Sequence, residues 1–466
     1  MKKAVAVVAV LLVLVLLAVL AGGILFRPRL ESDPPQISLS TNADTVGATP
    51  FAIIVGDAGA GLKSVSVTLS QGGSDQTLAS EVFAQPVAEQ RIPVALSKVP
   101  GLKEGPVTLR VVARDASIRN WLAGNEAKFE KTLTVDITPP TLELVADDRY
   151  VNFGGVGAIV YKVSADTAKS GVKFGDRFYP GFPAVIQDHP DHYFALFAHA
   201  YDVPADARPS LIATDKAGNT REMRLAYELK NVKYKKSTIA LTDNFLQNKV
   251  APLLDDVASK QGTPKEIFVA VNKRLRKVNE DKIAEITTKA TPSILWNGAF
   301  VQLTNSKVEA NFADLRTYTY NGEAADTAYH LGYDLSVTKN VPVEAANSGT
   351  VAFAGPLGIY GNTVILDHGL GLFTLYGHLN SFDVKVGDSV TKRQPLGKTG
   401  ETGLAAGDHL HYGVYLDGVA VLPVEWWDPK WIEDNVQPKL AGHTGTETAV
   451  AQQAAKPHKA NKKRSR

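Results

Sequence analysis

Two short segments near the C-terminus, His330-Leu-Gly-Tyr-Asp334 and His409-Leu-His411, decide the fold and carry candidate metal ligands. Imidazole and carboxylate groups are the ligands that a catalytic zinc uses, with one position left for water. Residues two apart point to one face of a strand, so His409 and His411 share a face. Residues four apart share a face on a strand or a helix, so His330 and Asp334 also converge. A lone His-x-His pair is weak evidence, because many such histidines are only packed or solvated.

The sequence around these histidines strengthens the metal interpretation, because it follows one pattern over residues 303–429. The further segments of the pattern are Gly361-Asn-Thr-Val-Ile-Leu-Asp-His-Gly369, Thr374-Leu-Tyr-Gly-His-Leu379, Val386-Gly-Asp-Ser-Val390, Gln394-Pro-Leu-Gly-Lys-Thr-Gly400 and Gly407-Asp-His-Leu-His-Tyr-Gly413. On these motifs the region resembles the lysostaphin-type (LytM-type) zinc endopeptidases, which cleave peptide bonds in bacterial peptidoglycan. The resemblance implies an antiparallel β zinc-peptidase domain.

The resemblance also implies a role for each of five residues. The first His and the Asp of His-x-x-x-Asp are zinc ligands in the family, which assigns His330 and Asp334 as ligands. The second His of His-x-His is the third ligand, here His411, so the resemblance implies one Zn²⁺ per chain. The remaining two histidines, His378 and His409, are implied to be catalytic. All five residues are present, which is not the pattern of the family's metal-free members.

Two features of residues 303–429 lie outside the assignments above. Some positions depart from the family pattern, and one further histidine is not expected to bind the metal. Tyr333 occupies a position that is commonly aliphatic, and residues 318–329 follow no family pattern, which leaves the cleft shape and substrate preference open. His368 falls between strand-like runs at residues 362–367 and 372–376. We therefore expect His368 in a turn, near the site but not on the metal.

The N-terminus predicts a membrane anchor. Residues 4–26 carry no charge, and as a helix they would extend about 34 Å, enough to span a bilayer. The apolar stretch of a cleaved secretory signal is shorter, so we favour a retained single-pass anchor over a cleaved signal. Lys2 and Lys3 favour a cytoplasmic N-terminus, although Arg27 and Arg29 weaken the charge asymmetry. The catalytic domain would then lie on the periplasmic or extracellular side of the cytoplasmic (inner) membrane.

Composition limits the remaining possibilities. The chain has 466 residues, which favours about three domains. Its net charge of +2 gives no reason to expect nucleic-acid binding. It has no cysteine, so neither a disulfide nor a lipid-modified cysteine is available. The absence of cysteine is compatible with an oxidising compartment but does not prove one.

A weak internal repeat lies between the anchor and residue 235. Asp33-Pro-Pro-Gln-Ile-Ser-Leu recurs as Thr138-Pro-Pro-Thr-Leu-Glu-Leu, and Val111-Val-Ala-Arg-Asp recurs as Leu211-Ile-Ala-Thr-Asp. The offset is about 100–110 residues, the length of one immunoglobulin-like sandwich. Alternating runs such as 64–70 and 107–113 predict half-buried strands. We favour two Ig-like β-sandwich modules over one irregular β domain, with a role in spacing or binding.

Residues 236–295 change character. Thr263-Pro-Lys-Glu266 is a capping box with proline at the first helical position. Apolar residues at helical spacing follow it and also precede it, at 245–257. We interpret the segment as a helical linker that packs on a neighbouring domain, with a lid over the catalytic cleft as the alternative. The end of the chain is polar and basic, and we predict a disordered tail that could attract anionic wall polymer or lipid.

The fold class predicted is multi-domain and mainly β, with an N-terminal transmembrane helix, two Ig-like modules, a helical segment and a C-terminal zinc-peptidase domain. The boundaries expected are 1–29, 30–137, 138–235, 236–295, 296–437 and 438–466. The function predicted is a zinc endopeptidase of peptidoglycan stem peptides or cross-links. A non-catalytic scaffold that activates another wall hydrolase is the alternative, and a wall-binding protein is a third possibility. We also expect a fragment from residue 236 to fold and cleave without the Ig-like modules.

Overall fold

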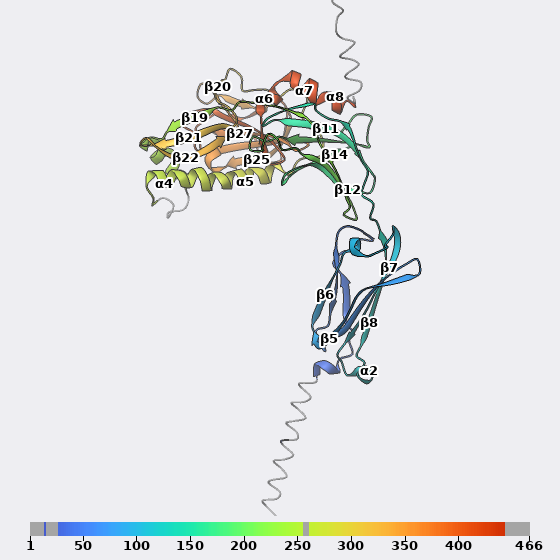
Figure 1. Ribbon diagram of the computed structural model, residues 1–466. Helices are drawn as coiled ribbons and strands as arrows, with labels where there is room; N and C mark the ends of the chain where they lie inside the picture. The colour runs from blue at the N-terminus through green and yellow to red at the C-terminus, as the bar shows by residue number, and fades with distance from the viewer. Residues whose placement is uncertain (1–13, 15–26, 255–260, 443–466) are drawn as a thin grey trace, which may run out of the picture. The chain divides into compact units, whose positions relative to one another are not determined.

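The computed structural model describes Leu14, residues 27–254 and residues 261–442 (Figure 1). The predicted transmembrane span and nearly all of the predicted tail lie outside the described residues. Within the described part of the chain, no helix is both long and apolar enough to cross a membrane. The chain divides into two compact units. The first comprises Met1–Pro140, Asp166–Ala168 and Thr214–Arg221, and the second comprises the rest.

The first unit is built around a two-layer β-sandwich. Its sheets have the strand orders β1-β3-β6 and β2-β8-β7-β4-β5. Alternate residues of the strands point inward, so that Val65 and Val67 of β4 face the core with Ile53 and Val55 of β3. The elements are η1 (Arg27–Leu30), β1 (Gln36–Leu39), β2 (Thr45–Val46), β3 (Phe51–Gly56), β4 (Leu62–Gln71), β5 (Ser74–Val87), β6 (Glu89–Val94), η2 (Leu96–Lys98), β7 (Gly105–Asp115), α2 (Arg119–Leu122) and β8 (Glu126–Val135).

A second set of short strands follows, mostly within the second unit. These strands form sheets of order β14-β15-β11-β9 and β13-β12-β16-β17, and a parallel pair β10-β18. Their bounds are β9 (Leu142–Ala146), β10 (Tyr150–Asn152), β11 (Val156–Val163), β12 (Thr167–Phe174), β13 (Arg177–Pro180), β14 (Phe182–Pro183), β15 (His192–Ala198), β16 (Ser210–Asp215), β17 (Thr220–Arg224) and β18 (Glu228–Lys230). We call residues 141–230 the second β-module.

The helical segment is present as predicted. Thr263 Oγ1 accepts from the Glu266 N–H, and the Glu266 carboxylate accepts from the Thr263 N–H, so the capping box is confirmed. Before it, the chain forms short helical turns at residues 243–253. The elements are β19 (Lys236–Ala240), α3 (Asp243–Phe245), η3 (Leu246–Val250), η4 (Ala251–Leu253), α4 (Pro264–Val269), η6 (Ala270–Leu275) and α5 (Arg276–Thr287).

An eight-stranded sheet forms the centre of the C-terminal region, with the order β20-β23-β31-β27-β26-β25-β29 and β32 paired to β31. Its strands are β20 (Lys307–Ala310), β23 (Tyr333–Ser336), β25 (Gly349–Pro356), β26 (Asn362–Gly369), β27 (Leu372–Leu379), β29 (Ser389–Val390), β31 (Leu410–Leu416) and β32 (Val419–Val421). Around it lie β21 (Asp314–Tyr320), β22 (Glu323–His330), β24 (Pro342–Glu344), η7 (Gly358–Tyr360), β28 (Ser381–Phe382), β30 (Pro395–Lys398), α6 (Pro423–Trp427), α7 (Pro429–Asn435) and α8 (Gln437–Leu440).

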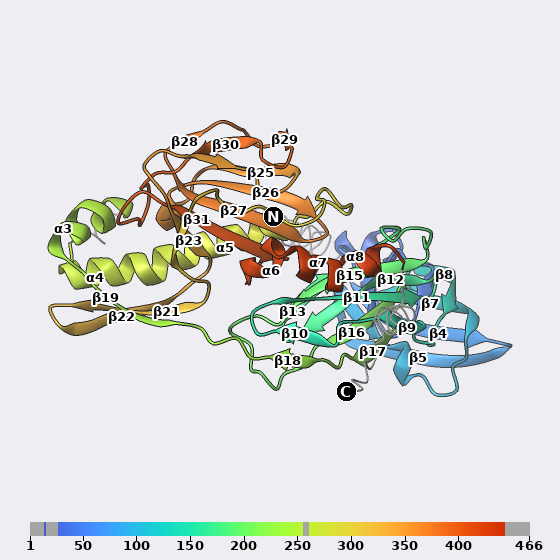
Figure 2. The same cartoon turned by 90° about the horizontal axis from the view of Figure 1, so that it is seen from above.

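The two faces of this sheet have different partners. On one face, which we call the closed face, Tyr376 of β27 and Tyr412 of β31 share a core with residues of the second β-module such as Phe194. On the opposite face, which we call the cleft face, Phe373 of β27 shares a core with Phe268 and other residues of helix α4–α5. The helix contacts β22 through α4 and η7 through α5, and Figure 2 shows α4 next to β22. Because side chains alternate along a strand, each of these strands supplies both cores.

Buried polar groups also join the second β-module to the C-terminal helices. Glu425 of α6 is 3% exposed and accepts from Asn152 Nδ2 at 2.7 Å and from the Val156 N–H at 2.9 Å. Lys439 of α8 donates to the buried carboxylate of Asp148. Such groups are costly to bury without their partners. This packing argues against our expectation that a fragment from residue 236 would fold alone.

Candidate active site

Three strands bring the expected ligands together. Asp334 of β23 lies directly opposite His411 of β31 in the antiparallel register, and His411 is also opposite Gly377 of β27. Asp334 and His411 both point to the cleft face. His330 is the last residue of β22, and only two residues separate it from the start of β23. This short connection turns the side chain of His330 back over Asp334.

The three side chains converge on one point. His330 Nε2 lies 2.9 Å from Asp334 Oδ1 and 3.1 Å from His411 Nδ1, and His411 Nδ1 lies 3.0 Å from Asp334 Oδ1. Ligand atoms about 2.0 Å from a tetrahedral zinc would be about 3.3 Å apart, close to these separations. The donor set and its geometry therefore fit a zinc ion.

Hydrogen bonds fix which atoms face the metal position. The carbonyl oxygen of Asn311 can only accept, so His330 Nδ1 carries the proton and donates to it at 2.9 Å. This leaves the lone pair of His330 Nε2 for a metal. Burial alone would raise the pKa of Asp334, but the charge and hydrogen bond of His330, with hydrogen bonds from His409 and His411, hold that pKa well below its usual value. Asp334 is thus a carboxylate ligand.

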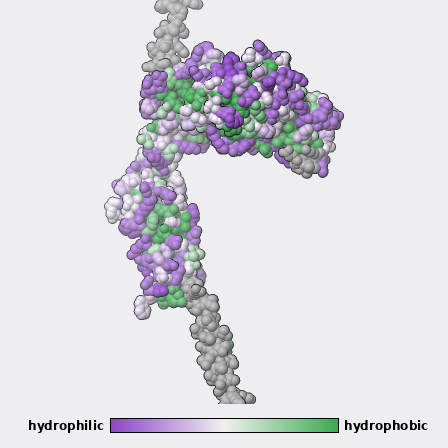
Figure 3. Space-filling model, turned by 180° about the vertical axis from the view of Figure 1, so that it is seen from behind, coloured by the Kyte–Doolittle hydropathy of each residue, from purple (hydrophilic) through white to green (hydrophobic). Residues whose placement is uncertain are grey.

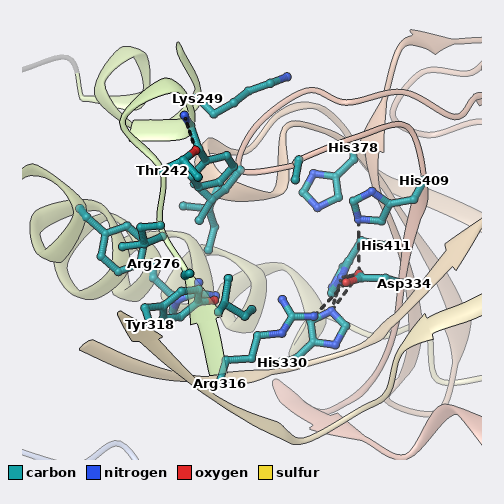
Figure 4. A pocket seen from close by; sticks show the side chains of 18 of the residues that line it. Thr242, Lys249, Arg276, Arg316, Tyr318, His330, Asp334, His378, His409 and His411 are labelled. Carbon is teal, nitrogen blue, oxygen red and sulfur yellow. Dashed lines mark hydrogen bonds and ion pairs between the residues drawn. The ribbon is translucent and has the colours of Figure 1, made fainter. Parts of the chain in front are cut away.

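The two expected catalytic histidines stand beside the ligands (Figure 4). The rings of His378 and His409 have centroids 4.8 Å apart. His378 Nδ1 donates to the carbonyl of Thr402 at 2.8 Å, and His409 Nδ1 donates to the carbonyl of Gly407 at 2.8 Å. In each ring Nε2 is therefore the nitrogen that can change its protonation, and His409 Nε2 lies 3.5 Å from Asp334 Oδ1, to which it donates when protonated.

His378 reaches the cleft face because the strand is locally distorted. The register between β26 and β27 shifts at this point, which is a β-bulge, and His378 has a left-handed φ of 61°. A bulge interrupts the alternation of side chains and redirects one of them. Strained backbone of this kind concentrates at functional sites. Strand periodicity alone would have put His378 on the closed face with Tyr376.

The two histidines differ in proton affinity. Burial and the neighbouring His409 and His411 lower the pKa of His378 well below its usual value. Burial also opposes the charged form of His409, but its hydrogen bond to Asp334 and the charge of that carboxylate raise its pKa overall. One ring thus favours the neutral form and its neighbour favours the protonated form, which suits them to different parts of a proton transfer.

The helical segment and β21 form the opposite wall of the cleft. A cavity of about 530 Å³ contains all five expected site residues together with Leu241, Phe245, Lys249 and Arg316. Figure 4 shows Lys249, Thr242 and Tyr318 facing the histidines across the cavity, while Arg316 lies beside His330 and Asp334. The segment predicted as a linker or lid therefore lines the site.

Arg316 is the residue that the sequence analysis missed. Its Nη2 lies 3.0 Å from Asp334 Oδ2, and its Nε lies 3.7 Å from Asp314 Oδ2. Arg316 thus binds the carboxylate oxygen that does not face the other ligands. No local motif marks it, because its importance depends on the pairing of β21 with β22, which sets Asp314 opposite His330.

The other described histidines have other surroundings. His368 is not in a turn near the site: it lies within β26, fully buried on the closed face, with Nδ1 2.7 Å from the Ser348 carbonyl and Nε2 2.7 Å from Thr374 Oγ1. His199 is buried beside the Tyr227 hydroxyl at 2.6 Å. His189, Asp191 and His192 form a second group whose ligand atoms are close together, outside the cleft. His443 and His458 lie outside the described residues.

Comparison with known proteins gives the class of this domain. Residues 328–423 match the model of Peptidase family M23, so the chain carries a domain of that family. DD-carboxypeptidase/endopeptidase Mpg of Neisseria meningitidis is 39% identical over 95 residues, which are 20% of this chain and 22% of that protein. Peptidoglycan DD-endopeptidase ShyA of Vibrio cholerae is 31% identical over 112 residues, 24% of this chain and 25% of that protein.

Among solved structures, the catalytic domain of the antimicrobial peptidase lysostaphin from Staphylococcus simulans is 30% identical. That match covers 26% of this chain and 92% of the lysostaphin domain, with a TM-score of 0.23. The chain thus spans about a quarter or less of the length of the curated relatives named above. The family match does not include the opposite wall of the cleft, because the residues up to β21 lie outside the matched range 328–423.

Proposed function

We propose that the protein is a zinc-dependent endopeptidase that cleaves stem peptides or cross-links of bacterial peptidoglycan. The observation that carries this proposal is the convergence of His330, Asp334 and His411, with His378 and His409 beside them in one cavity. A scaffold without activity would have no need for this arrangement. The two relatives described above, a DD-carboxypeptidase/endopeptidase and a peptidoglycan DD-endopeptidase, support the choice of substrate.

One zinc ion per chain would be held by His330 Nε2, His411 Nδ1 and Asp334 Oδ1. When bound, zinc supplies a Lewis acid that lowers the pKa of a water ligand and polarises a carbonyl. Arg316 occupies Asp334 Oδ2, which leaves the other oxygen for the metal and fixes the carboxylate in place. Asp334 is therefore oriented from the opposite wall.

The proposed catalytic work belongs to His378 and His409. Each donates its Nδ1–H to a backbone carbonyl, so Nε2 is the nitrogen that gains or loses a proton at the cavity. Each can take a proton from an attacking water, and a protonated ring can donate to the oxyanion or to the leaving amine. The raised pKa of His409 suits it to hold the proton, and the lowered pKa of His378 suits it to accept and orient the water.

We further propose that the chain is anchored in the cytoplasmic membrane by residues 4–26, with the peptidase domain on the outer side. The uncharged span behind Lys2 and Lys3 supports this orientation. The partners would then be peptidoglycan and the membrane, with anionic wall polymer or lipid at the basic tail. The first unit and the second β-module would be Ig-like spacing modules.

Digestion of purified peptidoglycan followed by mass spectrometry of the products tests the proposed activity. New free termini in the stem peptides or cross-links, absent with His378→Ala, are the expected result. A folded, zinc-loaded protein that releases no peptide fragments but stimulates another wall hydrolase would support the scaffold alternative instead.

A further inference from the structure

An apolar tip is exposed at the end of the first unit where the described chain begins. Trp121 is fully exposed at 101%, Leu122 is 68% exposed and Ile118 is 39% exposed. Leu30 of η1 adds a side chain that is 49% exposed. Figure 1 shows α2 beside η1, and Figure 3 shows apolar surface at this end of the unit. Exposed apolar groups that gather in one place mark a contact surface.

The tip is held in one conformation. The carboxylate of Asp115 accepts from the Ser117 N–H at 2.9 Å and from the Asn125 N–H at 2.7 Å, so it fixes both ends of the loop. Asn120 Nδ2 donates to the Gly124 carbonyl at 3.0 Å. These bonds offset the cost of left-handed backbone at Asn120, Trp121 and Leu122, with φ of 50°, 57° and 69°. The backbone is thus strained in a conformation that points the Trp121 side chain into solvent.

The tip lies beside the end of the uncharged stretch 4–26. The Ile118 N–H donates to the Arg29 carbonyl at 2.8 Å, and Arg119 Nε donates to the Leu30 carbonyl at 3.2 Å. Arg29 is three residues beyond Phe26, a separation of at most about 11 Å in a fully extended chain. Any bilayer spanned by residues 4–26 would therefore have its surface close to this tip.

The charges around the tip suit phospholipid headgroups. Lys63 Nζ donates to the Leu122 carbonyl at 3.2 Å, and Arg29 and Arg119 are exposed beside it. Two of the acidic groups at this end bind backbone groups, since the Asp57 carboxylate accepts from two backbone N–H groups and the Glu31 carboxylate accepts from the Ala60 N–H, while Asp33 is exposed. Tryptophan flanked by basic residues is the combination that membrane interfaces favour.

We propose that Leu30, Ile118, Trp121 and Leu122 insert into the outer headgroup region of the bilayer that residues 4–26 span. The inference rests on the proposed anchor and is independent of the proposed peptidase activity. The tip would seat the first unit on the membrane surface, so that the chain is held at two points rather than by its anchor alone.

Fluorescence of the full chain in lipid nanodiscs tests this contact. The discs contain phosphatidylcholine with one-third phosphatidylglycerol, with or without bromine on the acyl chains near the headgroup. The chain has five tryptophans, so the difference between wild type and Trp121→Phe isolates Trp121. We expect bromine to quench this component at least twofold and to leave the other tryptophans unchanged. Trp121 is fully exposed, so its replacement by phenylalanine should not affect folding.

Ile137 provides a matched control, because it is 41% exposed and follows the end of β8 that is opposite to the tip. In the double variant Trp121→Phe, Ile137→Trp, the new tryptophan should not be quenched. An unquenched Trp121 in discs that retain the chain after alkaline washing would overturn the inference alone. Trp121 emission that is blue-shifted but unquenched would place a second copy of the chain on the tip and also overturn it. Loss of the chain on washing would overturn the anchor, and the inference with it.

Discussion

Neighbouring residues of β31 serve opposite faces of the central sheet. Tyr412 points to the closed face, where its ring meets that of Tyr376 edge-to-face with centroids 5.6 Å apart, while His411 points to the cleft face beside His330. The closed face gains its stability from burial of large apolar side chains against the second β-module. The cleft face instead buries the imidazoles of His330, His378 and His411 and partly buries His409 and the carboxylate of Asp334, so these groups lose solvation. The comparison indicates that apolar burial on the closed face offsets the free-energy cost of desolvating polar groups on the cleft face.

The largest effect on folding should follow from removing the second β-module, which packs on the closed face. A fragment of residues 236–466 loses Asp148, Asn152 and the apolar core of the second β-module, which leaves Lys439 without its carboxylate partner and Glu425 without its two hydrogen-bond donors. We expect it to be insoluble or unfolded by circular dichroism. A fragment of residues 141–466 should fold and bind zinc. Equal folding of the two fragments would show that the closed face does not need the second β-module.

Substitution of a histidine on each face should separate activity from stability. His409→Ala on the cleft face removes a proton-transfer group, so we expect peptidoglycan hydrolysis to fall by about 10²–10⁴-fold with little change in stability. His368→Ala on the closed face removes a group bonded to Ser348 and Thr374, so unfolding free energy should fall by about 1–3 kcal/mol. Zinc content should stay near one per chain in both. Hydrolysis assays, denaturant titrations and metal analysis distinguish the outcomes.

A smaller effect on zinc affinity and activity is expected from substitution of Arg316, which lies on the cleft wall outside the residues that match the family. Arg316→Ala releases Asp334 Oδ2, and loss of such a partner typically weakens metal binding or activity by about 10–100-fold. Arg316→Lys keeps the charge and should recover part of the loss. Zinc competition titrations with a chelator measure the affinity. Wild-type affinity and activity in Arg316→Ala would show that the opposite wall does not orient the ligand.

The smallest effect concerns the pH dependence of stability. Burial raises the pKa of Glu425 to about 8, above the value of about 4.5 in the unfolded chain. Between these values the folded state holds a proton that the unfolded state lacks, so stability is full below about pH 4.5 and declines as pH rises through 8. Glu425→Gln should flatten this decline by up to about 1.4 kcal/mol per pH unit. Denaturant titrations at pH 5 to 8 with saturating zinc measure it, and an unchanged slope would contradict the role assigned to Glu425.

The sequence predicted which residues of the motif-bearing strands share a face, because this depends only on their spacing along the chain. His409 and His411 share a face by strand periodicity alone, and the capping box at Thr263 was found from four consecutive residues. The bulge at His378 and the contact from Arg316 could not be predicted in this way, since both depend on how distant strands pair. The packing of Glu425 on Asn152 joins residues 273 positions apart, which no local pattern indicates.

The most direct test of the account compares the two histidines of one segment. His411 Nδ1 lies 3.1 Å from His330 Nε2 and 3.0 Å from Asp334 Oδ1, whereas His409 Nε2 lies farther from Asp334 Oδ1, at 3.5 Å, and its ring stands beside that of His378. Removal of one of three ligands should leave a site that holds zinc poorly. We predict that purified His411→Ala contains little zinc and is inactive, and that His409→Ala contains about one zinc per chain and is inactive. Zinc lost from His409→Ala but retained by His411→Ala would contradict the assignment of ligand and catalyst.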